Sequence, residues 1–222
     1  MFKLDSRSRL SKKKHLKTEG VILGSTKIKE CDKLVYIYSK DFGKIRTLAK
    51  GSLKTSSKFT GLIETLNVCQ LELYQGPGNL LITEVRTIKT HKILRENLKK
   101  IQTGILITKI TSLLTLESET LPEIYHLLVE SIAAIEESEK ELIILTHYIV
   151  KLFDILGLLP NYKDEHTSSK LSMKEKRLIQ FIRNNPLSQS LRIRLEPEEE
   201  AQLKNLLQNM VAMETNNQIK IP

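Results

Sequence analysis

The chain of 222 residues has few cysteines, glycines, prolines and aromatic residues, and it has no tryptophan. Its two cysteines, Cys31 and Cys69, lie far apart and form no CxxC pair. This argues against a secreted disulfide scaffold and against a zinc site built from four thiolates. Because 40% of the residues are apolar, a core can form without a metal or disulfide. We expect one large or two small domains in a reducing compartment.

Long hydrophobic runs are also missing. The most apolar segment, residues 142–159, is interrupted by His147, Lys151 and Asp154, so it is too short and too polar to cross a bilayer. The basic N-terminus is not followed by the apolar stretch of a signal peptide. We therefore expect a soluble, cytoplasmic protein. On this apolar segment, His147 is expected to be a satisfied core residue and not a ligand.

No constellation of catalytic residues is present. The chain lacks the GxxxxGK[ST] phosphate loop, its five histidines are scattered, and the closest carboxylates in the basic part are Glu30 and Asp32. The Gly-Pro-Gly of residues 76–78 indicates a hairpin turn and not a phosphate cradle, because no helix start follows it. We expect no catalytic residue, no cofactor and no metal, and thus a protein that is not an enzyme.

Positive charge is concentrated at the start of the chain. Residues 1–60 hold 16 Lys/Arg against 5 Asp/Glu, whereas residues 111–160 hold 2 against 9, within a total net charge of +9. A solubility surface would mix both signs, so a segregated positive part indicates a polyanionic partner. Nucleic acid is the commonest such partner, although an acidic protein or an anionic membrane also fits the charge.

Apolar alternation predicts strands in the first part of the chain. Residues 19–25, 33–39, 67–74 and 79–88 read as strands, and another follows a turn at residues 41–43. Five strands with a longer gap at residues 50–65 are typical of a small closed barrel of the OB type. The gap contains Lys50, Lys54 and Lys58 and no acidic residue before Glu64. Such a loop is free to carry function, although a basic solvated loop explains the same residues.

The apolar period changes to that of a helix from His91 onward. Leu94, Leu98, Ile101 and Ile105 are spaced as one helix face. Capping boxes are expected at Thr120–Glu123, Ser138–Glu141 and Ser172–Glu175, a helix end at Gly157, and a last helix at 197–211. The sequence thus predicts a two-part α+β fold, with an OB-fold barrel at 17–89 and an all-α helical domain at 90–213. A basic extension at 1–16 and a flexible tail at 214–222 are expected to flank them.

Three segments carry a resemblance to a known family. TEGVILG (18–24), ECDKLVYIYSKDFGK (30–44) and LAKGSLK (48–54) resemble the N-terminal barrel of RecO, a bacterial recombination mediator. HYIVKLFDILGLLPN (147–161) is similar to the central helix of that family and its Leu-Gly-x-x-Pro exit. Many members place a four-cysteine zinc motif after this exit, whereas the corresponding NYKDEHTSSKLS has no cysteine and His166 alone cannot hold zinc. A zinc motif is therefore absent.

The resemblance implies a non-enzymatic protein of DNA repair and recombination in the cytoplasm, associated with the nucleoid. Such a protein binds single- and double-stranded DNA and anneals complementary strands. It acts with RecR and with the acidic C-terminal tail of single-strand binding protein, so that RecA is loaded onto DNA. Annealing needs strands that are held by their phosphates while the base edges stay free to pair.

Basic residues of the barrel and of its junction with the helices are the predicted DNA contacts. They are Lys44, Arg46, Lys50, Lys54, Lys58, Arg86, Lys89, Lys92 and Arg95, joined by Lys12, Lys13 and Lys14 of the extension. Lys44 and Arg46 are two apart on a strand and so share one face. Phe42 and Phe59, in turns, are candidates for base stacking, whereas Tyr36 and Tyr38 are assigned to the core.

The tail of single-strand binding protein is expected in an apolar groove with a basic rim on the helical part. Arg177, Arg183, Arg192 and Arg194 are rim candidates, and a solvated helix surface explains them equally well. Two other functions remain open. One is an OB-fold RNA- or ribosome-associated binding module, because phosphate contacts do not distinguish sugars. The other is a protein–protein adaptor whose basic end meets an acidic partner.

Overall fold

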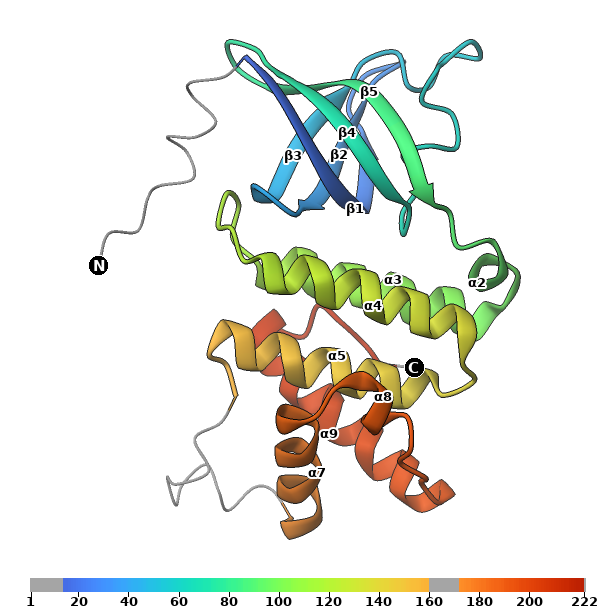
Figure 1. Cartoon of the computed structure of the whole chain (residues 1–222), viewed down its shortest axis with the longest axis vertical. Helices are drawn as coiled ribbons and strands as arrows, with labels where there is room; N and C mark the ends of the chain where they lie inside the picture. The colour runs from blue at the N-terminus through green and yellow to red at the C-terminus, as the bar shows by residue number, and fades with distance from the viewer. Residues whose placement is uncertain (1–13, 160–171, 222) are drawn as a thin grey trace.

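A five-stranded barrel stands on a layered group of helices in the computed structural model (Figure 1). The structure describes residues 14–159 and 172–221. The strands are β1 (His15–Lys27), β2 (Lys33–Ser39), β3 (Gly43–Ala49), β4 (Val68–Gln75) and β5 (Leu80–Lys89). They close in the order β1-β2-β3-β5-β4, in which only β3 and β5 run parallel. The predicted two-part fold with an OB-like barrel first is therefore confirmed.

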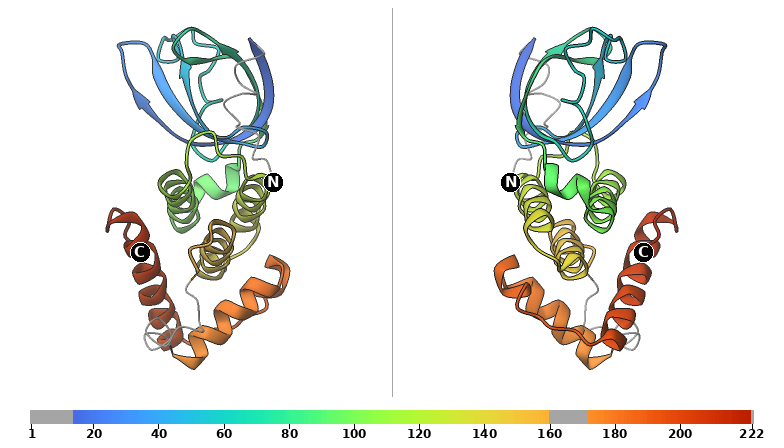
Figure 2. Two further views of the ribbon diagram at one scale, coloured as in Figure 1. Left: turned by 90° about the vertical axis from the view of Figure 1, so that its left-hand side faces the viewer. Right: turned by 90° about the vertical axis from the view of Figure 1, so that its right-hand side faces the viewer.

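Strand β1 is longer than the sequence pattern predicts, because it serves two neighbours. Its first half pairs with β4, where His15 faces Tyr74, and its second half pairs with β2, where Lys27 faces Lys33. The ladder with β2 is irregular between Ile22 and Gly24, and such an irregularity bends a strand. The bend carries the chain from the far end of the barrel to the helices and back, as Figure 2 shows.

The helices lie in successive layers below the barrel (Figure 1). They are α2 (Lys92–Glu96), α3 (Leu98–Leu114), α4 (Pro122–Glu137), α5 (Glu141–Leu156), α7 (Met173–Asn184), α8 (Leu187–Ser190) and α9 (Pro197–Thr215). The capping box of Ser172 with Glu175 and the left-handed Gly157 after α5 are confirmed. These are the two helix boundaries with the clearest local signals.

Three local helix predictions are wrong. The helix expected from His91 breaks at Asn97, whose side chain caps α3, so Leu94 is buried while Leu98 is exposed. Thr120 does not cap α4, which starts after Leu121 with Pro122 in its first turn. Lys140, not Ser138, precedes α5, and no side chain caps that helix.

The barrel has an interior core and a second, shared core against the helices. Ile22, Ile37 and Leu71 belong to the interior cluster. Val21, Tyr38 and other barrel residues instead join the cluster of α3, α4 and α5. The hydroxyl of Tyr38 donates to the carbonyl of Leu121 at 3.1 Å, and burial raises the pKa of that hydroxyl. The shared core fixes the barrel on the helices.

The loop between α3 and α4 docks on the first residues of β3. The N–H of Ser118 donates to the carbonyl of Lys44 at 2.9 Å. At Gly43, φ is +65°, and an added Cβ would lie 1.8 Å from the carbonyl oxygen of Glu119. Only glycine allows this approach, because it tolerates positive φ and has no side chain.

The chain after α9 packs against that helix. The sequence predicts a flexible tail from residue 214, but α9 continues to Thr215 and Ile219 is buried. Gln208 donates to the carbonyl of Ile219 at 3.0 Å and accepts from the N–H of Ile221 at 2.7 Å. Two hydrogen bonds and one buried side chain thus hold this segment on the helical part.

His147 of α5 is buried, and its Nδ1 lies 2.9 Å from the hydroxyl of Ser190. The prediction of a satisfied core histidine is confirmed. Burial lowers the pKa of His147 from 6.5 to about 4. Because the unfolded chain then binds more protons below pH 6.5, stability is complete above that pH and falls as the pH drops towards 4.

We expect the wild type to lose about 2–3 kcal/mol of unfolding free energy from this residue between pH 7 and pH 4.5. Urea unfolding at both pH values measures the loss. His147→Gln cannot take up the proton, so its pH dependence should be smaller by that amount. An identical pH dependence in both proteins would contradict the assignment.

Candidate nucleic-acid interface

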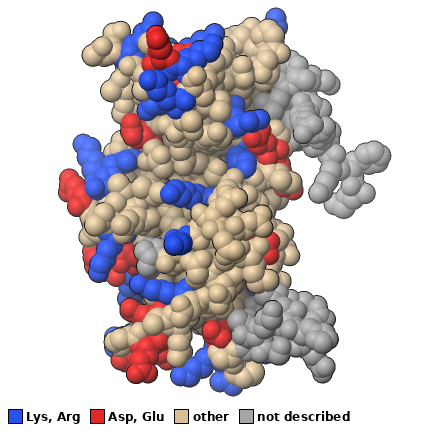
Figure 3. Space-filling view, turned by 180° about the vertical axis from the view of Figure 1, so that it is seen from behind, with Lys and Arg blue, Asp and Glu red and all other residues tan. Residues whose placement is uncertain are grey.

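Lysines gather at the end of the barrel that faces away from the helices. On the side of the molecule seen in Figure 3, Lys and Arg surround a few acidic side chains at this end, and more basic groups follow towards the helices. The end is built by the tip of the β1–β2 hairpin and by the turn after β3. Ala49, the last residue of β3, pairs with Lys33, so Lys50 follows directly beside the hairpin.

Hydrogen bonds join these two segments. The N–H of Gly51 donates to the carboxylate of Asp32 at 2.8 Å, and the N–H of Leu53 donates to the carbonyl of Cys31 at 3.0 Å. The hairpin tip is closed by the N–H of Ile28, which donates to the carbonyl of Asp32 at 3.1 Å. We call the cationic residues so assembled the lysine cluster: Lys27, Lys29, Lys33, Lys50 and Lys54.

The lysine cluster is solvent-facing and largely uncompensated. Lys33 is half-buried and the other four are exposed, and none has an ion pair with a described residue. Glu30 and Asp32 are the acidic residues of the same segments, and the carboxylate of Asp32 is already engaged by Gly51. Lys14 lies at this end too, since its carbonyl accepts from Gln75 at 2.8 Å. The arrangement can hold a polyanion through several point charges.

Lys44 and Arg46 share one face of β3, as predicted, but that face meets the α3–α4 loop. The ammonium of Lys44 donates to the carbonyl of Ser112 at 2.7 Å, and partial burial lowers its pKa. Arg46 pairs with Glu117 at 2.7 Å, and both side chains remain about half exposed. The ammonium of Lys44 is therefore engaged by the last turn of α3, while Arg46 must exchange a carboxylate for a phosphate before it can bind one.

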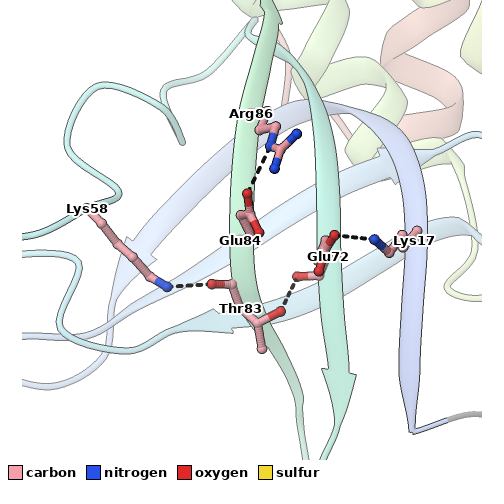
Figure 4. Close-up of polar contacts among 6 residues, drawn as sticks. All are labelled: Lys17, Lys58, Glu72, Thr83, Glu84 and Arg86. Atoms are coloured by element: carbon pink, nitrogen blue, oxygen red, sulfur yellow. Dashed lines mark hydrogen bonds and ion pairs between the residues drawn. The ribbon is translucent and has the colours of Figure 1, made fainter.

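The outer face of β1, β4 and β5 is electrically mixed (Figure 4). Arg86 pairs with Glu84 at 2.8 Å, and Lys17 pairs with Glu72, which stands opposite Glu84 in the ladder. The ammonium of Lys58 donates to the carbonyl of Thr83 at 2.6 Å. On this face Arg86 is thus compensated by Glu84, Lys17 by Glu72, and Lys58 is engaged by a backbone carbonyl.

The remaining candidates lie at the junction between barrel and helices, and they differ in whether their charge is already engaged. Lys89 pairs with Glu136 at 3.2 Å, and the same carboxylate lies 3.0 Å from the buried imidazole of His91. Lys92 is exposed. Arg95 is structural: its guanidinium donates to the carbonyls of Thr90 and Thr65 at 2.9 and 2.6 Å and to Oδ1 of Asn67 at 2.8 Å.

Arg95→Ala should destabilise the fold by about 2–3 kcal/mol, because buried Asn67 and the carbonyl of Thr65 lose their donor. Lys92→Ala, on the same short helix, should stay within about 0.5 kcal/mol of the wild type. Denaturant unfolding of both variants measures the difference. Equal stabilities would show that the three hydrogen bonds are replaced by water at no cost.

The base-stacking prediction for Phe59 is wrong. Its side chain is 5% exposed and belongs to the interior core of the barrel, with the ammonium of Lys58 5.3 Å from the ring centroid. Phe42 is half-buried and packs against the same core. Tyr38 is buried as expected, and Tyr36 packs partly buried against the shared core. The predicted contacts Lys12 and Lys13 lie outside the described residues.

The helical part contains a groove of about 730 Å³ between the starts of α3 and α5, the segment before α9, and α9 itself. Leu142, Leu145 and Leu195 give it an apolar floor.

Of the predicted rim arginines, Arg194 lines the groove, whereas Arg183 pairs with Asp154 at 2.9 Å and Arg177 lies on α7. Arg192 is exposed outside the lining. The cationic lining of Lys99, Lys140, Arg194 and Lys204 is balanced by Glu139, Glu141, Glu196 and Glu200.

Neither a metal site nor a membrane-spanning helix is found within residues 14–159 and 172–221. No three His, Cys, Asp or Glu side chains of this part are grouped as metal ligands. None of its helices has the length and apolar character that crossing a membrane requires. His166 lies outside the described residues.

The strand order of the barrel, the attached helices and the cationic barrel end define a two-part protein of the OB type. Residues 14–91 match the family described as "Recombination protein O N terminal". The chain is 28% identical to the DNA repair protein RecO of Thermoanaerobacter sp. (strain X514) over 146 residues, 65% of this chain and 59% of that protein. It is 25% identical to the protein of the same name from Listeria monocytogenes over 144 residues, 65% and 56% of the two chains.

A third relative, the DNA repair protein RecO of Nostoc sp., is 31% identical over 152 residues, 66% of this chain and 51% of that protein. The chain is thus similar to RecO proteins over about two thirds of its length, and its barrel matches the N-terminal part of that family. The match spans between about half and three fifths of the length of these curated relatives.

Sequence reasoning missed Lys27, Lys29 and Lys33 of the lysine cluster. These residues occur in a stretch that also contains Glu30 and Asp32, so the local charge is low. The available signal was the hairpin itself: two strands joined by a short turn bring Lys27 opposite Lys33.

Proposed function

We propose that the chain is a non-enzymatic DNA-binding protein of recombinational repair, and that the lysine cluster is its primary DNA contact. The single observation that carries this proposal is the assembly of five lysines from two separate segments at one barrel end. The relatives that the chain matches are named DNA repair proteins. Lysine heads supply point charges for phosphates and no fixed pattern for reading bases.

Binding without base readout fits strand annealing. A surface that grips phosphates leaves the Watson–Crick edges of a single strand free, so a complementary strand can pair while both are held. The same contacts accept a duplex, because its backbone carries the same charge. We therefore propose binding to both single- and double-stranded DNA, with annealing as the functional outcome.

The proposed partners are RecR and single-strand binding protein, through which RecA gains access to coated DNA. For the acidic tail of single-strand binding protein, the groove at Arg194 is the best-supported place, since apolar side chains there accompany Lys99 and Lys204. The four glutamates of the groove repel an acidic peptide. One carboxylate oxygen of Glu141 is buried without a hydrogen bond in the described structure. The tail would have to bind towards the cationic side of the groove.

The proposal is tested by annealing of complementary oligonucleotides that are coated with single-strand binding protein. Faster annealing with the chain than without it supports both DNA binding and recognition of the coat. Binding to bare oligonucleotides in dilute buffer is measured beside it, because an adaptor that only meets acidic proteins would not bind them. A competition with RNA of the same sequence completes the test: a clear preference for RNA would favour an RNA-binding module instead.

A further inference from the structure

Two large apolar side chains are exposed within the lysine cluster. Ile28, at the hairpin tip, is 46% exposed, and Leu53, in the turn after β3, is 40% exposed. A single exposed leucine or isoleucine is ordinary on a protein surface. These two, however, belong to the segments that two hydrogen bonds hold together, and lysines adjoin both of them: Lys27 and Lys29 flank Ile28, and Lys54 follows Leu53.

Such a surface combines two chemistries that a single-stranded nucleic acid presents together. The strand has phosphates, which lysines neutralise, and unpaired bases, whose faces are apolar and otherwise exposed to water. In a duplex the bases are stacked, so the same apolar side chains would lie against charged backbone or a groove edge and gain little. A surface of lysines alone would bind both forms according to their charge.

We propose that Ile28 and Leu53 contact the faces of unpaired bases and thereby give the lysine cluster a preference for single strands over duplex. This inference rests on the proposed DNA-binding function and assigns its specificity to two residues. The lysines set the total affinity and its salt dependence. The two apolar side chains set the difference between base-exposed and base-paired ligands, without distinguishing one base from another.

The test uses the full chain and three probes: a mixed-sequence single strand, the duplex of the same length, and an abasic strand with the same number of phosphates. The variant Ile28→Ser/Leu53→Ser keeps every lysine. Fluorescence anisotropy gives the dissociation constants. We expect the dissociation constant for the single strand to rise about fivefold to twentyfold, because apolar burial is lost. Binding to the duplex and to the abasic strand should change less than about twofold, with an unchanged salt slope.

The matched control is Leu116→Ser/Met213→Ser, two exposed apolar side chains outside the barrel, which should bind all three probes like the wild type. The inference is overturned if the Ile28/Leu53 variant keeps its affinity for the single strand, or loses affinity equally for all three probes. Failure of the wild type to bind any of the probes would instead refute the proposed DNA-binding function.

Discussion

Charge reversal at four lysines of the barrel end should weaken binding to a single-stranded oligonucleotide about a hundredfold or more at moderate salt. The variant is Lys27→Glu/Lys33→Glu/Lys50→Glu/Lys54→Glu. Each of these side chains is without an ion pair in the described structure, so its charge is available to a phosphate. Their replacement removes four cations and adds four anions at one surface.

The salt dependence gives a second, independent readout. If each lysine neutralises one phosphate, the slope of log K against log[salt] should become shallower by about 2.8 on single strands. Anisotropy titrations between about 50 and 200 mM salt measure both the affinity and the slope. In about this range, the affinity of a protein with several phosphate contacts changes strongly. The fold should remain intact, because these are surface positions away from the cores.

A control of equal charge separates a local contact from a net-charge effect. Lys174→Glu/Arg177→Glu/Arg192→Glu/Lys220→Glu reverses four exposed cations on α7, before α9 and after α9. Its net charge equals that of the barrel variant, yet we expect it to retain most of the affinity and nearly the wild-type slope. Equal losses in both variants would mean that total charge, and not the lysine cluster, determines binding.

Gly43→Ala should destabilise the protein by about 3–5 kcal/mol, the largest effect expected from a single methyl group. Its φ of +65° disfavours any side chain, and the new Cβ would lie 1.8 Å from the carbonyl oxygen of Glu119. Because that neighbour is backbone, the α3–α4 loop must move. The movement breaks the hydrogen bond from Ser118 to Lys44 and the ion pair of Arg46 with Glu117.

Substitutions at two other glycines separate the cost of backbone strain from the cost of the steric clash. Gly61 has φ of +72° with open space at the Cβ position, so Gly61→Ala reports backbone strain alone, about 1–2 kcal/mol. Gly24 has neither positive φ nor a close neighbour, and Gly24→Ala should be nearly neutral. Thermal and denaturant unfolding measure all three variants. If Gly43→Ala costs no more than Gly61→Ala, the contact with Glu119 does not hold the barrel on the helices.

Much of the fold follows from local sequence patterns. Alternating apolar residues locate all five strands within a few positions, and Gly157 and the Ser172–Glu175 capping box locate their helix ends. These signals act over two to four residues, so they survive without tertiary context. The expected caps at Thr120 and Ser138 fail because α4 begins after Leu121 and α5 after Lys140, and neither helix has a side-chain cap.

The candidate site was less predictable, because the sequence does not show whether the charge of a basic residue is free or is engaged by a carboxylate or a carbonyl. Arg95 and Lys44 are held by backbone carbonyls of distant segments, and Arg86 by a carboxylate two residues away. Phe59 turns inward to fill the barrel. Nothing local in the sequence marks these partners, since most of them come from other strands and loops.

The sequence by itself determined the order of barrel and helices, the excess of positive charge in the first quarter, and the resemblance to the RecO family, because each depends on composition or short-range period. Only the tertiary structure decided which cations stay available. Barrel closure carries Lys27, Lys33 and Lys50 to one end, while α3 engages Lys44 and the loop after α3 engages Arg46. That division arises from pairing between residues far apart in the chain, which a one-dimensional pattern does not encode.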